Sequence, residues 1–315
     1  MNLYTAIQAA LPATLDDDAI LSDDGGRYTW RDLERGTAML ANLLHSLKLQ
    51  PVGKGRDRRP PVVAAHVDKS VESLMLYLAT LRAGLVFLPL NPAYRAAELD
   101  YFVADAQPAV LVCRTQDLDW VSPLAAHRGV GHLFTLNDDR TGSLLVHGAQ
   151  HPDQHTVVAR QPSDLAAILY TSGTTGRSKG AMLTHGNLLS NAVMLKEYWG
   201  WTATGGPDGR GDVLIHALPI FHVHGLFVAI HAALLNGSKM IWLNRFDPRT
   251  VIARMREATV FMGVPTLYVR MLAEPALTRE AAQGMRLFIS GSAPLLIETF
   301  TEWQQRTGHT ILERY

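Results

Sequence analysis

The chain has 315 residues, and 47% of them are hydrophobic, which is enough for about two globular domains with buried cores. Lysine plus arginine and aspartate plus glutamate number 29 each, so no net field favours nucleic acid or an anionic membrane. No uncharged apolar run reaches membrane-spanning length. The composition therefore indicates a globular protein that binds small molecules, with no nucleic-acid partner and no membrane insertion.

The first residues, 1–15, contain no lysine or arginine and lead into three aspartates, 16–18. This pattern fits neither a secretory signal nor a transit peptide, so we expect a cytoplasmic protein. Cys113, the one cysteine, lies in an apolar run, which is typical of a core side chain rather than a nucleophile.

Short apolar runs alternate with longer amphipathic segments in the first half of the chain. Such alternation is typical of buried parallel strands covered by helices, so we expect a βα-layered unit. The predicted strands are 61–67, 85–90 and 109–113, with helices at 70–84 and 96–106 between them. A basic loop at 53–61 and a glycine-rich loop at 202–211 are expected on the surface, and the basic loop has no assigned role.

A polar, weakly patterned stretch at 147–163 interrupts this alternation, which restarts at Leu165. We therefore expect an α/β fold of two subdomains, the first over 1–163 and the second over 164–315. Strands of the second subdomain are predicted at 165–170, 212–218, 239–244, 259–264, 286–290 and 310–315. Asp247 before Pro248 predicts a helix start, and Gly308 predicts the end of a helix that begins near Leu295.

The strand predicted at 165–170 leads into a run of hydroxyls, glycines and cations, residues 171–180. Its glycines allow amide N–H groups to turn inward, and its hydroxyls and two cations add donors, so the run is suited to a polyphosphate. A Walker-type loop differs, because its lysine follows glycine, whereas Lys179 follows Ser178. A flexible linker is the alternative, but a linker has no reason to join a buried strand to a helix-like run at 187–199 and to carry two cations.

The run 171–180 resembles the signature loop of adenylate-forming enzymes, which include acyl-CoA synthetases, luciferases and peptide-synthetase adenylation domains. The resemblance implies catalytic roles for Lys179 and Thr171, and it makes Thr171 a candidate contact for the Mg²⁺ that accompanies ATP. Many relatives carry proline where Ser178 stands, a difference that adds donors here. The phosphate-binding residues implied are Thr171, Ser172, Gly173, Thr174, Thr175, Gly176 and Lys179.

Three downstream segments follow the order usual in this superfamily. The segment 218–225 resembles the lining of the acyl pocket and implies that His222 lies near the reacting carboxylate or at the pocket wall, as a catalytic and acyl-binding residue. On the residues alone, His222 and His224 could form half of a metal site, but no acid or cysteine with ligand spacing accompanies them, so a histidine at a helix entry is favoured. The other two segments imply adenylate contacts by Ser290, Gly291, Ser292, Ala293, Pro294, Glu313, Arg314 and Tyr315.

Within the superfamily, the sequences of four segments look most like those of the malonyl-CoA synthetases, namely 170–188, 212–228, 261–270 and 285–296. That resemblance implies that Arg270 and Ser292 bind the distal carboxylate of malonate, which a guanidinium suits by bidentate pairing. A surface position along its helix is the alternative for Arg270, and Arg286 is a second candidate for the same role.

The implied activity is that of an AMP-forming acid-thiol ligase. Malonate and ATP, with Mg²⁺, give malonyl-adenylate and pyrophosphate, and CoA then gives malonyl-CoA and AMP. We expect the chain to stop before the small C-terminal domain of the superfamily. Two alternatives stay open, namely a synthetase for another acid such as methylmalonate or a fatty acid, and a nucleotide-binding fragment without turnover.

Overall fold

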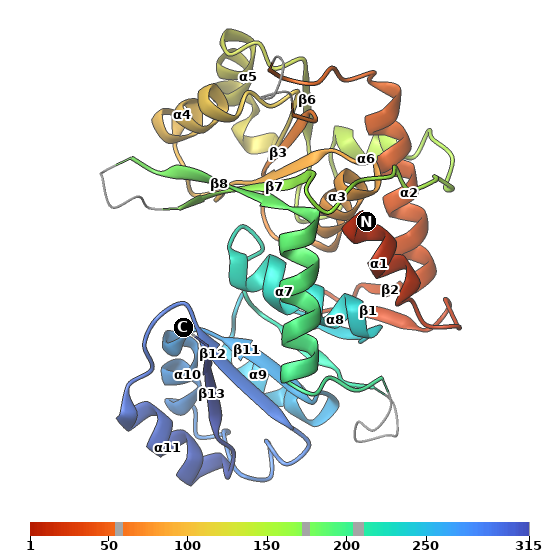
Figure 1. Cartoon of the computed structure of the whole chain (residues 1–315). Helices are drawn as coiled ribbons and strands as arrows, with labels where there is room; N and C mark the ends of the chain where they lie inside the picture. Colours follow the sequence, from red (N-terminus) through yellow and green to blue (C-terminus); the bar gives the residue numbers. More distant parts are fainter. Residues whose placement is uncertain (54–58, 172–176, 204–210, 315) are drawn as a thin grey trace. The chain divides into compact units, whose positions relative to one another are not determined.

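The structure is a computed structural model that describes residues 1–53, 59–171, 177–203 and 211–314 (Figure 1). The chain divides into two compact units. Unit 1 contains Met1–Ala9 and Asp32–Ser190, and unit 2 contains Ala10–Arg31 and Asn191–Tyr315. Each unit holds a mostly parallel sheet with helices around it, so the predicted α/β class is confirmed.

In the described residues, the sheet of unit 1 has six strands in the order β6-β5-β3-β4-β7-β8. They are β3 (Val62–His66), β4 (Val86–Pro89), β5 (Val110–Cys113), β6 (His132–Thr135), β7 (Leu165–Thr171) and β8 (Lys179–Thr184). All neighbours pair in parallel except β7 and β8, which are antiparallel. β3, β4 and β5 are buried along their whole length, which explains their uninterrupted apolar sequences.

The helices of unit 1 cover both faces of this sheet (Figure 1). They are α1 (Leu3–Ala9), α2 (Trp30–Ser46), α3 (Val71–Arg82), α4 (Ala96–Ala106), α5 (Leu118–His127), α6 (Ser143–Gly148) and the start of α7 (His185–Tyr198). α3 begins with a capping box, in which Ser70 and Ser73 each accept from the other's backbone amide, and every residue of the helix is buried. α4 and α5 pack against each other, and Leu99, Phe102 and Val121 join the core on their face of the sheet.

The sheet of unit 2 has seven described strands in the order β13-β12-β11-β9-β10-β1-β2. They are β1 (Asp18–Ser22), β2 (Arg27–Thr29), β9 (Leu214–His216), β10 (Met240–Trp242), β11 (Val260–Gly263), β12 (Leu287–Gly291) and β13 (Ile311–Arg314). β2 is antiparallel to β1, and every other described pair is parallel.

The helices of unit 2 fill the connections between these strands. They are the end of α7, α8 (His231–Asn236), α9 (Pro248–Arg254), α10 (Pro265–Leu272) and α11 (Ile297–Thr307), with a π-helical segment at His224–Ile230. The predicted helix start is confirmed, since the Asp247 carboxylate accepts from the Thr250 amide at 2.7 Å. The predicted stop is also confirmed, because Gly308 ends α11 in the left-handed conformation at φ 80°. No helix in the described ranges is long and apolar enough to cross a membrane.

The bounds of the two units differ from the subdomains predicted at 1–163 and 164–315. Residues 10–31 join unit 2 because β1 pairs with β10, and residues 164–190 stay in unit 1 because β7 pairs with β4. The subdomain division stays a prediction, since a compact unit need not fold alone. Residues 54–58 of the basic loop and 204–210 of the glycine-rich loop lie outside the described residues.

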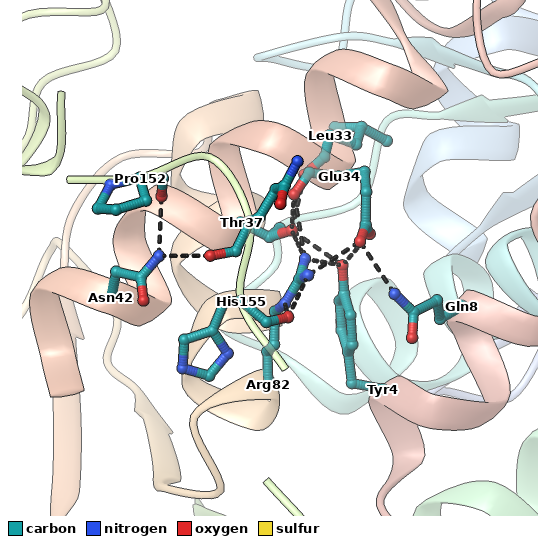
Figure 2. A network of polar contacts seen from close by, with 10 residues as sticks. Tyr4, Gln8, Leu33, Glu34, Thr37, Asn42, Arg82, Pro152 and His155 are labelled. Atoms are coloured by element: carbon teal, nitrogen blue, oxygen red, sulfur yellow. Dashed lines mark hydrogen bonds and ion pairs between the residues drawn. The ribbon is translucent and has the colours of Figure 1, made fainter. Parts of the chain in front are cut away.

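A buried arginine joins four segments of unit 1 (Figure 2). Arg82, at the end of α3, forms an ion pair with Glu34 of α2 at 2.9 Å, and its side chain is only 3% exposed. Its guanidinium also donates to the Tyr4 hydroxyl of α1 at 3.1 Å and to the His155 carbonyl at 2.6 Å. A buried guanidinium is tolerated only when its donors are paired, so these contacts hold α1, α2, α3 and the segment around His155 together.

Replacing this arginine with an apolar residue should destabilise the protein strongly. Arg82→Leu leaves the Glu34 carboxylate without its positive partner and the His155 carbonyl without its donor, and breaking a buried ion pair costs about 3 kcal/mol or more. Urea denaturation followed by circular dichroism measures the free energy of unfolding. The matched control is Arg128→Leu, which breaks the more exposed pair with Asp100 and should change the free energy of unfolding far less. Equal losses in the two variants would contradict this account.

Candidate functional site

The predicted phosphate loop, 171–180, begins at the last residue of β7 and ends in β8, the two antiparallel strands that form the β7–β8 hairpin of unit 1. Thr171 ends β7 and Lys179 begins β8, and their Cα atoms are direct partners across the antiparallel ladder. Both side chains are exposed. The residues between the two limbs that were predicted to bind phosphate, 172–176, lie outside the described residues. The hairpin therefore brings together two of the three residues to which the sequence assigned catalytic roles, Thr171 and Lys179, but not His222.

The hairpin adds an element that the sequence did not predict, because the expected order was a strand, the loop 171–180 and then the helix-like run 187–199. β8 intervenes, and α7 begins only at His185. The sequence of β8, Lys-Gly-Ala-Met-Leu-Thr, gives little signal for a strand, since four of its six residues are exposed or polar and one is glycine.

In unit 2, the end of β12 and the turn that follows it contain the predicted adenylate contacts 290–294. Ser290 is fully buried, and its hydroxyl has no hydrogen-bond partner in the described part of the chain. Ser292 is exposed and has a φ of 67°, in the left-handed region that residues other than glycine rarely occupy. Such strained residues cluster at ligand sites, so the turn has the properties expected of one. Ala293 is half-buried and Pro294 exposed on the far side of the turn.

Gly291 lies close to two neighbouring segments. A Cβ atom at position 291 would lie 2.8 Å from the Arg314 carbonyl oxygen and 3.1 Å from Cε1 of His224. Real Cβ atoms essentially never approach a backbone oxygen to 2.8 Å, and the contact at 3.1 Å would require the His224 ring to shift, so glycine is required here. The parallel register of β12 and β13 pairs Gly291 with Arg314 and thereby joins two of the predicted motifs.

His224 is the functional candidate that the sequence reasoning missed. It is buried at the start of the π-helical segment, and its Nδ1 lies 3.5 Å from the Ser292 hydroxyl, at the long limit of a hydrogen bond. Its Nε2 has no partner in the described residues. Burial, with a smaller contribution from the nearby Arg314, lowers the pKa of His224 to about 4, so the ring is neutral at pH 7. The one signal in the sequence was its place two residues after His222. The π-helix, a form frequent at functional sites, is seen only in the structure.

His222, the histidine that was predicted to contact substrate, is exposed before the π-helical segment. Its ring lies 4.5 Å from the ring of Phe221, and partial desolvation of the ring lowers the pKa of His222. The expected position at a helix entry agrees with this geometry. The structure brings His224, rather than His222, into contact with Ser292.

The chain end contributes Arg314 and Glu313 to the same edge of the sheet. Glu313 accepts from the backbone amide of Leu295 at 2.6 Å and so ties β13 to the residues after the turn. Burial lowers the pKa of the Arg314 guanidinium. Tyr315 lies outside the described residues.

The two arginines considered for the distal carboxylate have different surroundings. Arg270 is exposed on α10, with its guanidinium 4.7 Å from the centre of the Phe246 ring. Arg286 precedes β12, where it donates to both carboxylate oxygens of the buried Asp212, at 3.1 and 2.7 Å. Arg286 also donates to the Trp199 carbonyl at 3.0 Å, so the fold already uses its donors. No described contact joins either arginine to Ser292.

Unit 2 contains a cavity of about 560 Å³ lined partly by Asp18, Asp212, Lys239 and Glu257. Each of these residues begins or precedes a parallel strand, so the cavity faces the amino ends of the strands. The candidate residues instead follow the carboxyl ends, which is where open parallel sheets bind their ligands. The cavity is therefore separate from the candidate site.

The side chains of the described residues determine whether the protein alone could hold Mg²⁺. Those residues contain no group of three histidine, cysteine, aspartate or glutamate side chains that could hold a metal ion. Mg²⁺ prefers oxygen ligands and keeps phosphates and waters among them, so it fits this chain as part of a nucleotide complex. Thr171 offers one hydroxyl oxygen at the limb of the hairpin.

Three comparisons with known proteins agree on the family. The AMP-binding enzyme family matches residues 7–315. The mitochondrial malonate–CoA ligase ACSF3 of Homo sapiens is 31% identical over 316 residues, which cover 95% of this chain and 52% of that protein. A malonate–CoA ligase of Arabidopsis thaliana is 30% identical over 346 residues, covering 100% of this chain and 55% of that protein.

The crystal structure of ATP-bound MatB from Rhodopseudomonas palustris is 47% identical to the chain, with a TM-score of 0.91. The match covers 100% of this chain and 59% of that chain. The chain thus spans about half the length of the curated relatives it matches. The fold expected from the resemblance to adenylate-forming enzymes is confirmed by this structural match, and the family match covers nearly every residue. The chain therefore belongs to the AMP-binding enzyme family.

Proposed function

We propose that this chain takes part in the ATP-dependent activation of malonate to malonyl-adenylate and then to malonyl-CoA. One observation carries the proposal. The strained turn at Ser292, the neutral His224 ring and Arg314 lie together at the carboxyl ends of parallel strands. That is the edge of a sheet where an adenylate is expected. The names of the human and Arabidopsis relatives, both malonate–CoA ligases, support malonate as the acid.

In the first step, a carboxylate oxygen of malonate attacks the α-phosphorus of ATP, and the bond to the bridging oxygen breaks to release pyrophosphate. Both reactants are anions, so the main requirement is positive charge and N–H or O–H donors placed before the reaction. Lys179 and the Thr171 hydroxyl face each other at the hairpin and would hold the phosphates that leave. Mg²⁺, when bound with ATP, neutralises part of the phosphate charge. The related MatB was crystallised with ATP bound, which supports ATP as a substrate of this chain.

In the second step, the thiol of CoA attacks the acyl carbon of the adenylate, the thiol proton leaves, and AMP departs with the electron pair of the acyl–oxygen bond. Within the described residues, the neutral His224 ring can accept or donate a hydrogen bond at the acyl group. His222 stays a candidate for the same region, since it begins the segment that leads to His224. We assign CoA, ATP and malonate as the small-molecule substrates.

The distal carboxylate of malonate is proposed to pair with Arg270 and the Ser292 hydroxyl. Arg270 is exposed and its contact with Phe246 is weak, so little free energy opposes its turning to a ligand. Arg286 is the poorer candidate, because pairing with malonate would leave the buried Asp212 without its guanidinium.

The predicted cytoplasmic location remains a proposal that rests on the composition of residues 1–15. The human relative is named as mitochondrial.

Removing the lysine of the hairpin should abolish most of the adenylation activity. Lys179→Ala should lower the rate of malonate-dependent pyrophosphate release on the order of 100-fold, because it removes one donor from the developing phosphate charge. The matched control is Arg249→Ala, which removes one positive charge from a side chain that is 81% exposed, and it should leave the rate unchanged. An unchanged rate in Lys179→Ala would exclude Lys179 from the reaction.

Replacing the arginine proposed for the distal carboxylate should change the choice of acid. Arg270→Met should raise the KM for malonate on the order of 10- to 100-fold, since a charged hydrogen bond is worth roughly 1.5 to 3 kcal/mol. The KM for butanoate, which lacks the second carboxylate, should stay nearly constant. Competition between the two acids in a coupled AMP assay measures the ratio. Equal changes for both acids, or a larger effect of Arg286→Met at unchanged stability, would contradict the assignment.

A further inference from the structure

One helix of unit 1 contacts both limbs of the β7–β8 hairpin. On the incoming limb, the Tyr170 hydroxyl donates to the Asp105 carboxylate of α4. On the outgoing limb, the Tyr101 hydroxyl of α4 donates to the Ser178 carbonyl at 2.7 Å. Tyr101 and Asp105 are four residues apart and therefore lie on the same face of the helix. α4 thus connects to the chain on each side of residues 172–176.

Ring contacts strengthen both connections. On the incoming limb, the Tyr170 ring lies 4.5 Å from the Phe102 ring, and a Cβ atom on Gly180 would lie only 3.3 Å from Tyr170. On the outgoing limb, the Arg177 guanidinium lies 5.9 Å from the centre of the Tyr101 ring. This distance is within the range of a cation–π interaction. The rings therefore restrict the direction in which each limb leaves the sheet.

The helix that makes these contacts is itself held firmly. Leu99, Phe102 and Val103 belong to the buried core of unit 1, and Asp100 pairs with Arg128 at the end of α5. Burial and the bond to Asp105 raise the pKa of Tyr170, so its hydroxyl keeps its proton as a donor. A rigid element that carries contacts to a functional loop is the arrangement that preorganises a site.

We propose that Tyr101 is a positioning residue for adenylate formation, with Asp105 as its counterpart on the other limb. The Ser178 carbonyl that Tyr101 fixes belongs to the peptide unit that leads directly into Lys179. Fixing that peptide sets the direction in which the lysine leaves the backbone, and displacements of about 1 Å at a reacting group can cost up to 100-fold in rate. This inference rests on the proposed function of Lys179.

The test removes the hydroxyl and keeps the ring. Tyr101→Phe should lower kcat for malonate-dependent pyrophosphate release about tenfold, by the misplacement argument, while the KM for malonate stays constant. The matched control is Tyr94→Phe, which removes a hydroxyl from another tyrosine whose ring lies 4.9 Å from that of Phe102, and it should leave kcat unchanged. Wild-type kcat in Tyr101→Phe would overturn the inference without affecting the proposed function.

A double-mutant cycle separates positioning from general stabilisation of the hairpin. In the Lys179→Ala background, Tyr101→Phe should have no further effect on kcat, because the group that it positions is absent. Multiplicative effects would show that Tyr101 acts independently of Lys179 and would overturn the inference. If the wild-type protein releases no pyrophosphate, or if Lys179→Ala has full activity, the proposed function fails first and the positioning role fails with it.

The second limb gives a test that does not depend on the folding of Tyr101→Phe. Asp105→Asn keeps an oxygen that can accept from the Tyr170 hydroxyl and should retain kcat within about twofold, whereas Asp105→Ala should lose about tenfold. Activity in Asp105→Ala equal to that of Asp105→Asn would contradict the role of the helix as a clamp on both limbs.

Discussion

The parallel register of β11, β12 and β13 is the constraint on which the candidate site in unit 2 depends. It pairs Gly263 with Ser290 and Gly291 with Arg314, so three segments far apart in sequence end at one edge of the sheet. The hydrogen bonds of the ladder are buried and obligatory, and a slip of one residue would turn each side chain to the opposite face. The chemistry of the turn after β12 is therefore determined by backbone pairing before any side chain makes a contact.

In unit 1, by contrast, the candidate residues lie on an antiparallel hairpin at the edge of the sheet. An edge hairpin has a neighbour on one side only and is held less firmly than a central strand. The aromatic side chains of α4 and β7 supply the missing restraint from the side of the core. A polyphosphate site needs donors in fixed directions, and in the site proposed here a helix outside the hairpin would provide that order.

Much of this architecture follows from the sequence, because the strands buried on both faces leave continuous apolar runs. The strands near 62, 86, 110, 260 and 287 and the caps at Asp247 and Gly308 were predictable for that reason. β8 was not predictable, because its largely exposed residues show no regular alternation of apolar and polar side chains. Nor does the sequence show that His224 is buried while His222 is exposed, or that Arg270 lies against Phe246, because partners distant in the chain determine these positions. The proposal that Arg270 rather than Arg286 pairs with malonate rests on Asp212, because Asp212 already pairs with Arg286 although the two are far apart in the sequence.

The path of the chain between the two units has a consequence for the order of synthesis. β1 is made among the first residues, yet its parallel partner β10 begins only at Met240. A growing chain on the ribosome therefore carries the β1–β2 hairpin without its sheet while the residues of unit 1 emerge and fold. Two strands alone are marginally stable, so Ile20 and its neighbours stay open to wrong partners during that interval. Slow translation between unit 1 and Met240 would prolong the exposure, and a chaperone that shields short apolar strands would have its greatest effect there.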